Sequence, residues 1–219
     1  SSDVCSSDLK TFRDSNGLWE EYKVEDVATP GAWHRNPGMV LDFYNQRRKQ
    51  ILLAQPNEAH KSIARLYEKF KVTVITQNID DLHERGGAKD VIHLHGEIRK
   101  ARSSFDPSLV YEIDNWELKL GEYCDKGSQL RPHIVWFGEM VPLIDYAAEI
   151  TSTADHFIVV GSSLEVYPAA SLVQYAGYDI PKYYIDPKAH SIGGLNNLRI
   201  IKGTAAHELP LLVDELLKI

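Results

Sequence analysis

An α/β fold is predicted by the sequence: a Rossmann-like, doubly wound parallel sheet with a small inserted helical or irregular lobe. Short runs of β-branched and aromatic residues alternate along the chain with stretches of helical spacing, which is the pattern of such folds. The runs are mostly apolar, as in parallel strands that are buried on both faces. Polar clusters follow the runs, and ligands of doubly wound sheets bind beyond the carboxyl ends of the strands.

Six segments are expected to be strands, namely 72–76, 91–95, 134–137, 157–160, 183–185 and 198–201. Between them, Asn57 is a candidate N-cap of a helix whose apolar residues recur at helical spacing as far as Phe70. A last helix is expected after Pro210. Two stretches lack the alternation: residues 24–55 read as helical, and residues 97–131 read as polar and irregular. We assign both to the inserted lobe.

Composition and charge exclude several classes of protein. Of 219 residues, 43% are hydrophobic and 25% are charged, which is ordinary for a globular chain and unlike a disordered one. The net charge of −7 and the pI near 5.7 argue against a nucleic-acid partner, because phosphate binding needs clustered Lys and Arg. No apolar run reaches the roughly 20 residues that span a bilayer. We therefore expect a cytoplasmic protein with no membrane partner.

Residues 1–9 differ from the rest of the chain. They read SSDVCSSDL, with Ser-Ser-Asp repeated, and they lack both the positive region and the apolar region of a signal peptide. We interpret this segment as a non-native or artefactual leader, and residues 10–219 as the folded domain.

Residues 76–80, Thr-Gln-Asn-Ile-Asp, follow one of the predicted strands. Their amides and carboxylate could hydrogen-bond a ribose or a carboxamide, since each offers directional donors or acceptors. Asn and Asp are also favoured in any turn between a strand and a helix. From these residues alone, the purely structural interpretation is the more favoured one.

His93 and His95 stand at i and i+2 and therefore face the same side of an extended strand. Three interpretations remain open. The pair could bind zinc, although only Glu97 is an obvious third ligand. Alternatively, His95 is a general base at the end of the strand, and Gly96 allows the close approach of a ligand. A histidine satisfied within the core is at least as favoured by the spacing.

Two further clusters are weak signals in isolation. Residues 161–163, Gly-Ser-Ser, follow an apolar run and could present amides and hydroxyls to a phosphate, but they lack the GxGxxG pattern. Tyr44 and Arg47 share a face of a predicted helix, where a guanidinium beside a phenol could bind a carboxylate. Because polar residues continue through 48–50, a solvated helix face is the favoured interpretation of this pair.

Together, five ordered motifs resemble those of the sirtuins, which are NAD-dependent protein-lysine deacylases. The motifs lie at residues 11–19, 76–83, 93–97, 132–139 and 161–163 and span nearly all of the chain. Tyr44 and Arg47 also match the pair that marks the class III branch, whose members prefer acidic acyl groups such as succinyl and malonyl. Residues 131–139, RPHIVWFGE, are similar to the bacterial members of that branch.

The resemblance implies NAD as the cofactor, acyl-lysine proteins or peptides as substrates, and His95 as the general base. The residues implied in cofactor binding are Phe12, Arg13, Gln77, Asn78, Ile79, Asp80, Gly161, Ser162, Ser163, Tyr184, Ile185, Asp186 and Ala205. The residues implied in substrate binding are Tyr44, Arg47, Val135, Phe137, Gly138, Glu139 and Val166.

The implied reaction removes succinyl, malonyl and, more weakly, acetyl groups from protein lysines, and it gives nicotinamide and O-acyl-ADP-ribose. Two departures from the family pattern bear on it. SSDVCSSDL stands where sirtuins have a strand and a glycine-rich GAGxS stretch. Only Cys124 stands between residues 97 and 131, where many sirtuins have two Cys-x-x-Cys pairs, so no zinc is expected. The alternatives are a catalytically impaired derivative that binds acyl-peptide or nucleotide, and mono-ADP-ribosyl transfer.

Overall fold

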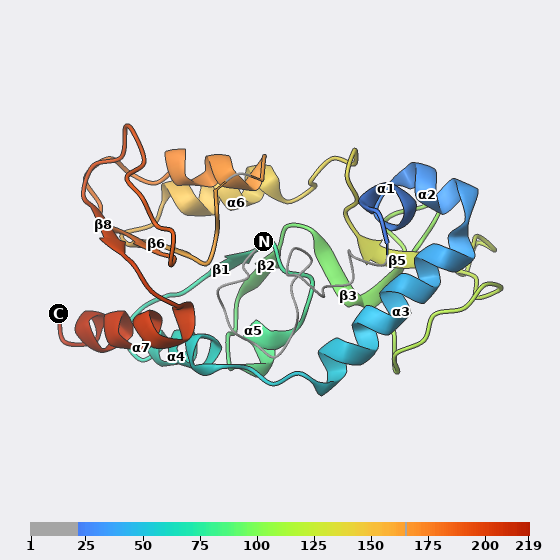
Figure 1. The fold of residues 1–219 in the computed structure, drawn as a ribbon, viewed down its shortest axis with the longest axis horizontal. Helices are drawn as coiled ribbons and strands as arrows, with labels where there is room; N and C mark the ends of the chain where they lie inside the picture. The colour runs from blue at the N-terminus through green and yellow to red at the C-terminus, as the bar shows by residue number, and fades with distance from the viewer. Residues whose placement is uncertain (1–21, 165) are drawn as a thin grey trace.

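The computed structural model describes residues 22–164 and 166–219, and two of its three groups of strands are parallel (Figure 1). The parallel strands are β1 (Val74–Thr76), β2 (Val91–His93), β6 (Phe157–Val160), β7 (Lys182–Ile185) and β8 (Leu198–Ile201). β1 pairs with β2, and β7 pairs with β6 on one side and β8 on the other. All five overlap the apolar runs of the sequence, which confirms the predicted fold class.

The third group is an antiparallel sheet in the order β4-β3-β5. Its strands are β3 (Gly96–Ser103), β4 (Val110–Glu112) and β5 (Leu130–Ile134). The irregular structure predicted for residues 97–131 is therefore wrong, and so is the strand predicted at 134–137, because β5 ends at Ile134. Buried and partly exposed residues alternate over much of β3. An antiparallel sheet with one solvated face accommodates charged residues that resemble a loop in sequence.

Three helices share one apolar core with the antiparallel sheet (Figure 1). They are α1 (Val24–Val27), α2 (Pro30–Arg35) and α3 (Pro37–Leu53). Before α2 and α3, the side chains of Thr29 and Asn36 each accept a hydrogen bond from a backbone N–H, and a proline follows in the first turn. Phe43, Ile98 and Trp136 are buried in the shared core, which joins these helices to the sheet.

The remaining helices cover both sides of the parallel strands (Figure 1). They are α4 (Glu58–Leu66), α5 (Leu82–Arg85), α6 (Ile144–Ser152), the 3-10 helix η2 (Ala169–Gln174) and α7 (Ala205–Leu216). α4 and α7 pack with Ile185 in one apolar cluster, while α6 and η2 pack with Ile92 in another. The predicted N-cap is confirmed, because Asn57 forms a reciprocal capping box with His60 at the start of α4.

The last helix begins at Ala205, so Pro210 lies inside it and the start predicted after Pro210 is wrong. A proline inside a helix removes one backbone hydrogen bond. The helix continues through it because residues on both sides are buried against the core, among them Leu209 and Val213.

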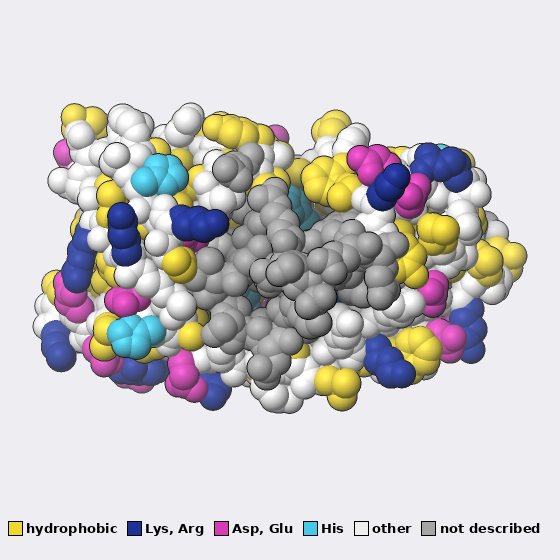
Figure 2. All heavy atoms as spheres, in the orientation of Figure 1, with side chains coloured by type: hydrophobic (Ala, Val, Ile, Leu, Met, Phe, Trp, Pro, Cys, Tyr) yellow, Lys and Arg dark blue, Asp and Glu magenta, His cyan; other side chains and the backbone are white. Residues whose placement is uncertain are grey.

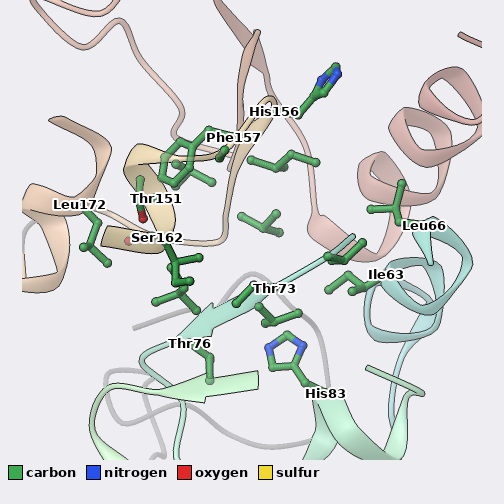
Figure 3. A pocket seen from close by; sticks show the side chains of 18 of the residues that line it. Ile63, Leu66, Thr73, Thr76, His83, Thr151, His156, Phe157, Ser162 and Leu172 are labelled. Carbon is green, nitrogen blue, oxygen red and sulfur yellow. The ribbon is translucent and has the colours of Figure 1, made fainter. Parts of the chain in front are cut away.

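A cavity of about 520 Å³ lies between β1 and β6, and no pairing joins these two strands within residues 22–164. Its wall is mostly apolar, with Ile63 and Leu66 from α4 and Leu172 from η2 (Figure 3). Thr76 and Ser162 lie in the same wall, where β1 and β6 end. The cavity therefore runs along β1 and β6 in the centre of the parallel layer and reaches the carboxyl ends of both strands.

Basic and acidic side chains are intermixed on the face shown in Figure 2. Exposed ion pairs in the structure include Arg65 with Asp214 and Arg199 with Glu215. None of the helices in residues 22–164 and 166–219 has the length and hydrophobicity that a membrane span requires.

Candidate active site

Two polar clusters that follow different strands line the same cavity. Gln77 and Asn78 come directly after β1, and Gly161 and Ser162 come directly after β6. Each cluster alone is compatible with an ordinary turn. Their convergence on one cavity is the arrangement expected of a ligand site at the carboxyl ends of parallel strands.

The loop 77–80 is held by hydrogen bonds rather than by a strand ladder. The N–H of Asn78 donates to Oγ1 of Thr76 at 3.0 Å, which turns the chain immediately after β1. The carbonyl of Ile79 accepts from the N–H of Ile98 at 2.8 Å, which ties the loop to β3. The loop is therefore fixed between the parallel and the antiparallel sheets.

Asp80 carries a partly buried carboxyl group at the end of this loop. Its Oδ1 accepts the N–H of Leu82 at 3.1 Å and so starts α5. Burial raises the pKa of Asp80, while this hydrogen bond and the charges of Arg47 and His93 oppose the rise. The carboxyl group thus lies within the electrostatic reach of cations from α3 and from β2.

His95 follows β2 and faces the same loop. Its Nδ1 lies 3.2 Å from the carbonyl oxygen of Gln77, so Nδ1 carries the proton and donates to that acceptor. Nε2 then keeps its lone pair. Burial lowers the pKa of His95, which favours the neutral ring near pH 7. A neutral imidazole with a fixed tautomer is suited to act as a general base.

Gly96 is required directly after His95. Its φ of +83° lies in the left-handed region, and a Cβ there would lie 2.1 Å from the carbonyl oxygen of His133. No side chain fits this approach. The close contact between β3 and β5 therefore fixes the backbone directly after His95.

The segment after β5 is tied to His95 and to the inserted lobe. The N–H of Val135 donates to the carbonyl of His95 at 2.9 Å, and the N–H of Phe137 donates to the carbonyl of Ala28 at 3.0 Å. Phe137 is 61% exposed and Gly138 is also exposed. The segment is thus fixed at alternate residues while its outer side remains open.

The side chain of Glu139 holds the segment after β5 in place. Its carboxylate accepts two hydrogen bonds from Arg131, at 2.7 and 3.0 Å, and further bonds from Arg102 and from the N–H of Trp136. The Arg131 guanidinium stacks over the Trp136 ring at 3.4 Å from its centroid. The Glu139 side chain therefore anchors the segment, and sequence spacing gave no signal of these partners.

Tyr44 and Arg47 are both buried, with 3% and 7% of their surface exposed. The favoured interpretation of a solvated helix face is therefore wrong. Nε1 of Trp136 donates to the Tyr44 hydroxyl at 3.0 Å, which places this phenol beside the segment that contacts His95. Burial raises the pKa of Tyr44, so the phenol keeps its proton.

Arg48 is also fully buried, which the sequence did not indicate. Its Nε donates to the carbonyl of Ile98, and its Nη1 donates to Asn45 and to the carbonyl of Trp116. All three partners belong to the inserted lobe. Arg48 therefore has a structural role, unlike Arg47, whose charge reaches Asp80.

On the far side of the cavity, the residues directly after β6 are hydrogen-bonded to β7. The hydroxyl of Tyr184 donates to the carbonyl of Ser162 at 2.9 Å, and the N–H of Gly161 donates to the carbonyl of Ile185 at 2.9 Å. Oδ1 of Asp186 accepts the N–H of Lys188 at 2.7 Å. These bonds fix the shape of the turn that carries residues 161–163.

Ile185, Ala205 and Val166 are not among the residues that line the cavity. The side chains of Ile185 and Ala205 are fully buried in the cluster that contains α7. Val166 is partly buried, and its carbonyl accepts the N–H of Ala170. Phe12 and Arg13 lie outside the described residues.

Several buried polar atoms in residues 22–164 and 166–219 have no hydrogen-bond partner. Two of them belong to predicted cofactor-binding residues, namely Oε1 of Gln77 and Oγ of Ser163. Buried polar groups in folded proteins are almost always paired, and unpaired ones call for an explanation. A ligand with hydroxyl or amide groups would satisfy both atoms, and the residues present therefore fit a nucleotide cofactor.

For a metal ion, the described part of the chain offers no group of three or more His, Cys, Asp or Glu side chains. Cys124 is a free, buried cysteine whose Sγ lies 3.4 Å from Oγ of Ser103. His93 contacts Glu84 and the carbonyl of Asn78.

The sequence pattern of the Sir2 family matches residues 4–168, and the chain belongs to this family. A protein of Helicobacter pylori strain 26695, named NAD-dependent protein deacylase, is 48% identical over 212 residues, which are 97% of this chain and 92% of that protein. A protein of Bacteroides thetaiotaomicron with the same name is 49% identical over 187 residues, which are 83% of this chain and 80% of that protein.

Solved structures agree with this assignment. A Sir2 homologue in complex with NAD is similar with a TM-score of 0.87 and 36% identity, over 99% of this chain and 87% of that chain. A mutant Sir2 homologue in complex with ADP-ribose has a TM-score of 0.88 and 36% identity, over 99% and 89% of the two chains.

Proposed function

We propose that this chain is an NAD-dependent protein-lysine deacylase that prefers succinyl and malonyl groups to acetyl groups. The observation that carries the proposal is that His95 joins two segments. Its ring donates to the carbonyl of Gln77 in the loop 77–80, and its own carbonyl accepts the N–H of Val135. A general base thus stands between a loop suited to a nucleotide and an open segment suited to a peptide. Relatives named NAD-dependent protein deacylase support the same reading.

On the cofactor side, Gln77, Ser162 and Ser163 would hold NAD through atoms that the fold leaves open or unpaired. Bound NAD supplies an electrophilic ribose carbon that can lose nicotinamide and an acceptor for the acyl group. His95 would take a proton from a hydroxyl through Nε2, because Nδ1 is already committed to Gln77. Burial lowers the pKa of His95, so the base is in its neutral, competent form at pH 7.

On the substrate side, residues 135–138 would pair with the backbone of an acyl-lysine peptide as an added strand. This mode of binding relies on main-chain groups and tolerates many peptide sequences. Phe137 and Gly138 are exposed, while the hydrogen bonds of Val135 and Phe137 to the protein hold the segment in place.

The acyl preference is assigned to Tyr44 and Arg47. A phenol and a guanidinium on one face of α3, both buried, match a carboxylate at the end of an acyl chain. Trp136 holds the phenol oxygen by donating to it, so the phenol proton stays available as a donor. A charge-assisted contact of this kind contributes roughly 1.5–3 kcal/mol, about one to two orders of magnitude in specificity.

The test of the activity is incubation of the protein with NAD and a succinyl-lysine peptide. Release of nicotinamide with O-succinyl-ADP-ribose supports the deacylase. Label transferred to protein from labelled NAD indicates mono-ADP-ribosyl transfer, and binding without turnover indicates a catalytically impaired derivative. His95→Ala should lower turnover about 10²–10⁴-fold without loss of the fold, as for a general base. A variant with near-parent turnover contradicts the assignment of His95.

The test of the preference is Arg47→Met, which should raise KM for succinyl peptides about 10-fold or more and leave acetyl peptides nearly unchanged. Lys49→Met is the matched control, because it removes the same charge from an exposed position of α3. Arg48 cannot serve as that control, since it is fully buried. If Lys49→Met and Arg47→Met act alike, the effect is general electrostatics and the pocket assignment fails.

A further inference from the structure

His93, the last residue of β2, is tied to the same loop as His95. Its Nδ1 lies 3.0 Å from the carbonyl oxygen of Asn78, and its Nε2 lies 2.7 Å from Oε1 of Glu84 on α5. The side chain of His93 is only 6% exposed. His95 reaches the preceding carbonyl, that of Gln77. Two histidines at i and i+2 therefore hold two consecutive carbonyls of one loop.

The two partners of His93 define its charge. A carbonyl oxygen accepts hydrogen bonds and does not donate them, and the same is true of an ionised carboxylate such as Glu84. Both ring nitrogens of His93 must therefore donate, and only the imidazolium does so. In a neutral ring, one nitrogen would direct its lone pair at an oxygen, and one of the two bonds would be lost.

The surroundings of His93 favour this charged form. Burial alone lowers the pKa of His93, but the hydrogen bonds to Glu84 and Asn78 outweigh it, and the net shift is upward. Burial also opposes ionisation of Glu84, yet the contact with His93 brings the pKa of Glu84 below its usual value. The hydrogen-bond geometry and the directions of both shifts therefore favour an imidazolium paired with a carboxylate.

We propose that His93 is a positioning residue: as an imidazolium it fixes the Asn78 carbonyl and thereby the orientation of the loop 77–80 that binds NAD. The inference rests on the proposed function, since it takes this loop to be the cofactor loop. His93 contacts the loop and α5 but not the reacting groups, which distinguishes it from His95. Its effect is therefore expected in cofactor affinity rather than in the chemical step.

The pH dependence has a defined direction. Carboxylates that face His93 are Asp80 from the loop, Glu84 from α5 and Glu97 from β3. The other titratable groups nearby are His83 on α5 and, around an adjoining cavity of about 370 Å³, Asp90, Lys100, His133 and Tyr146. Lys100 is itself paired with Glu97 at 2.9 Å. The imidazolium is present below the raised pKa of His93 and is lost as pH rises through it, so KM for NAD should rise on the alkaline side.

The charge state is tested on the unmodified full chain by ¹⁵N NMR of the histidine rings. The signals of His93 are those that disappear in His93→Gln. At pH 7 both of its ring nitrogens should be protonated, while His95 should show one protonated nitrogen. A neutral His93 ring at pH 7 overturns the proposal, and this measurement does not require NAD.

The positioning role is tested by kinetics. His93→Phe keeps a ring but removes both donors, and it should raise KM for NAD about 10-fold or more with kcat changed less than about threefold. His93→Gln retains a neutral donor and should recover part of that loss. In Glu84→Gln the His93 ring loses the carboxylate that raises its pKa. The rise of KM for NAD with increasing pH should therefore begin at a lower pH. An unchanged KM in His93→Phe, or equal losses in kcat and KM, overturns the role.

The two proposals fail differently. If the parent protein releases no nicotinamide from NAD, the proposed function is overturned and the cofactor role of the loop with it. The NMR result still decides whether His93 is charged. If instead the parent is active and His93→Phe has the parent's KM for NAD, only the role of His93 is wrong.

Discussion

Replacement of Arg48 by methionine tests how the inserted lobe is held together. The guanidinium is fully buried on α3. Its Nε donates to the carbonyl of Ile98 at 2.6 Å, and its Nη1 donates to Oδ1 of Asn45 and to the carbonyl of Trp116, each at 2.7 Å. These bonds connect α3 to β3 and to the chain near residue 116, so one side chain joins three parts of the lobe.

The expected cost follows from the groups that lose their donor. Methionine is apolar and leaves the carbonyls of Ile98 and Trp116 without this partner, while Asn45 still exchanges two hydrogen bonds with Leu118. A buried carbonyl without a partner costs about 1–3 kcal/mol. Burial and the nearby Arg99 both lower the pKa of Arg48, because the charged guanidinium is disfavoured in this environment. Removing the guanidinium relieves that cost and offsets part of the loss. The net loss should be about 3 kcal/mol.

The assay is urea unfolding at pH 7, followed by a thermal melt. A loss of about 3 kcal/mol corresponds to a fall in Tm of about 6–12 °C for a domain of this size. Lys49→Met is again the matched control, since Lys49 is exposed and should change stability by less than about 0.5 kcal/mol. If Arg48→Met costs less than about 1 kcal/mol, the burial penalty cancels the hydrogen bonds and the reasoning is refuted.

Three further outcomes are expected. Gly96→Ala should destabilise the fold by at least about 2 kcal/mol and lower activity, because its Cβ would meet the carbonyl of His133 at a φ of +83°; parent-like unfolding would contradict this. Burial lowers the pKa of His60 and of His83 from 6.5 to about 4, so the unfolded chain gains protons first as pH falls. Stability should therefore decrease from pH 6.5 to 4, with a shallower slope in His60→Gln, and an unchanged slope would refute the assignment. Elemental analysis should find no stoichiometric zinc, and about one zinc per chain would contradict this expectation.

Local patterns in the sequence predicted the parallel part of the fold well. Strands buried on both faces leave continuous apolar runs, and the cap at Asn57 leaves a residue type that marks a helix start. The antiparallel sheet could not be predicted in this way. Half-exposed strands such as β3 carry charged residues, and their pairing depends on partners far along the chain.

The site shows the same division. Spacing placed His93 and His95 on one side of a strand, but which carbonyl each ring holds depends on how the loop 77–80 folds back. The burial of Arg48 depends on partners 50 and 68 positions away, so its sequence neighbours suggested a solvated position. Residue types were readable from the sequence, whereas their partners required the tertiary structure.

The packing of α4 on α7 has a consequence for synthesis of the chain on the ribosome. Arg65 of α4 and Asp214 of α7 are paired across 149 positions of sequence. At roughly 5–20 residues per second, α7 emerges about 7–30 s after α4. Until then Ile63 and Leu66 lack the helix that covers them in the finished protein. The nascent chain therefore presents an apolar helix surface to chaperones until α7 has emerged.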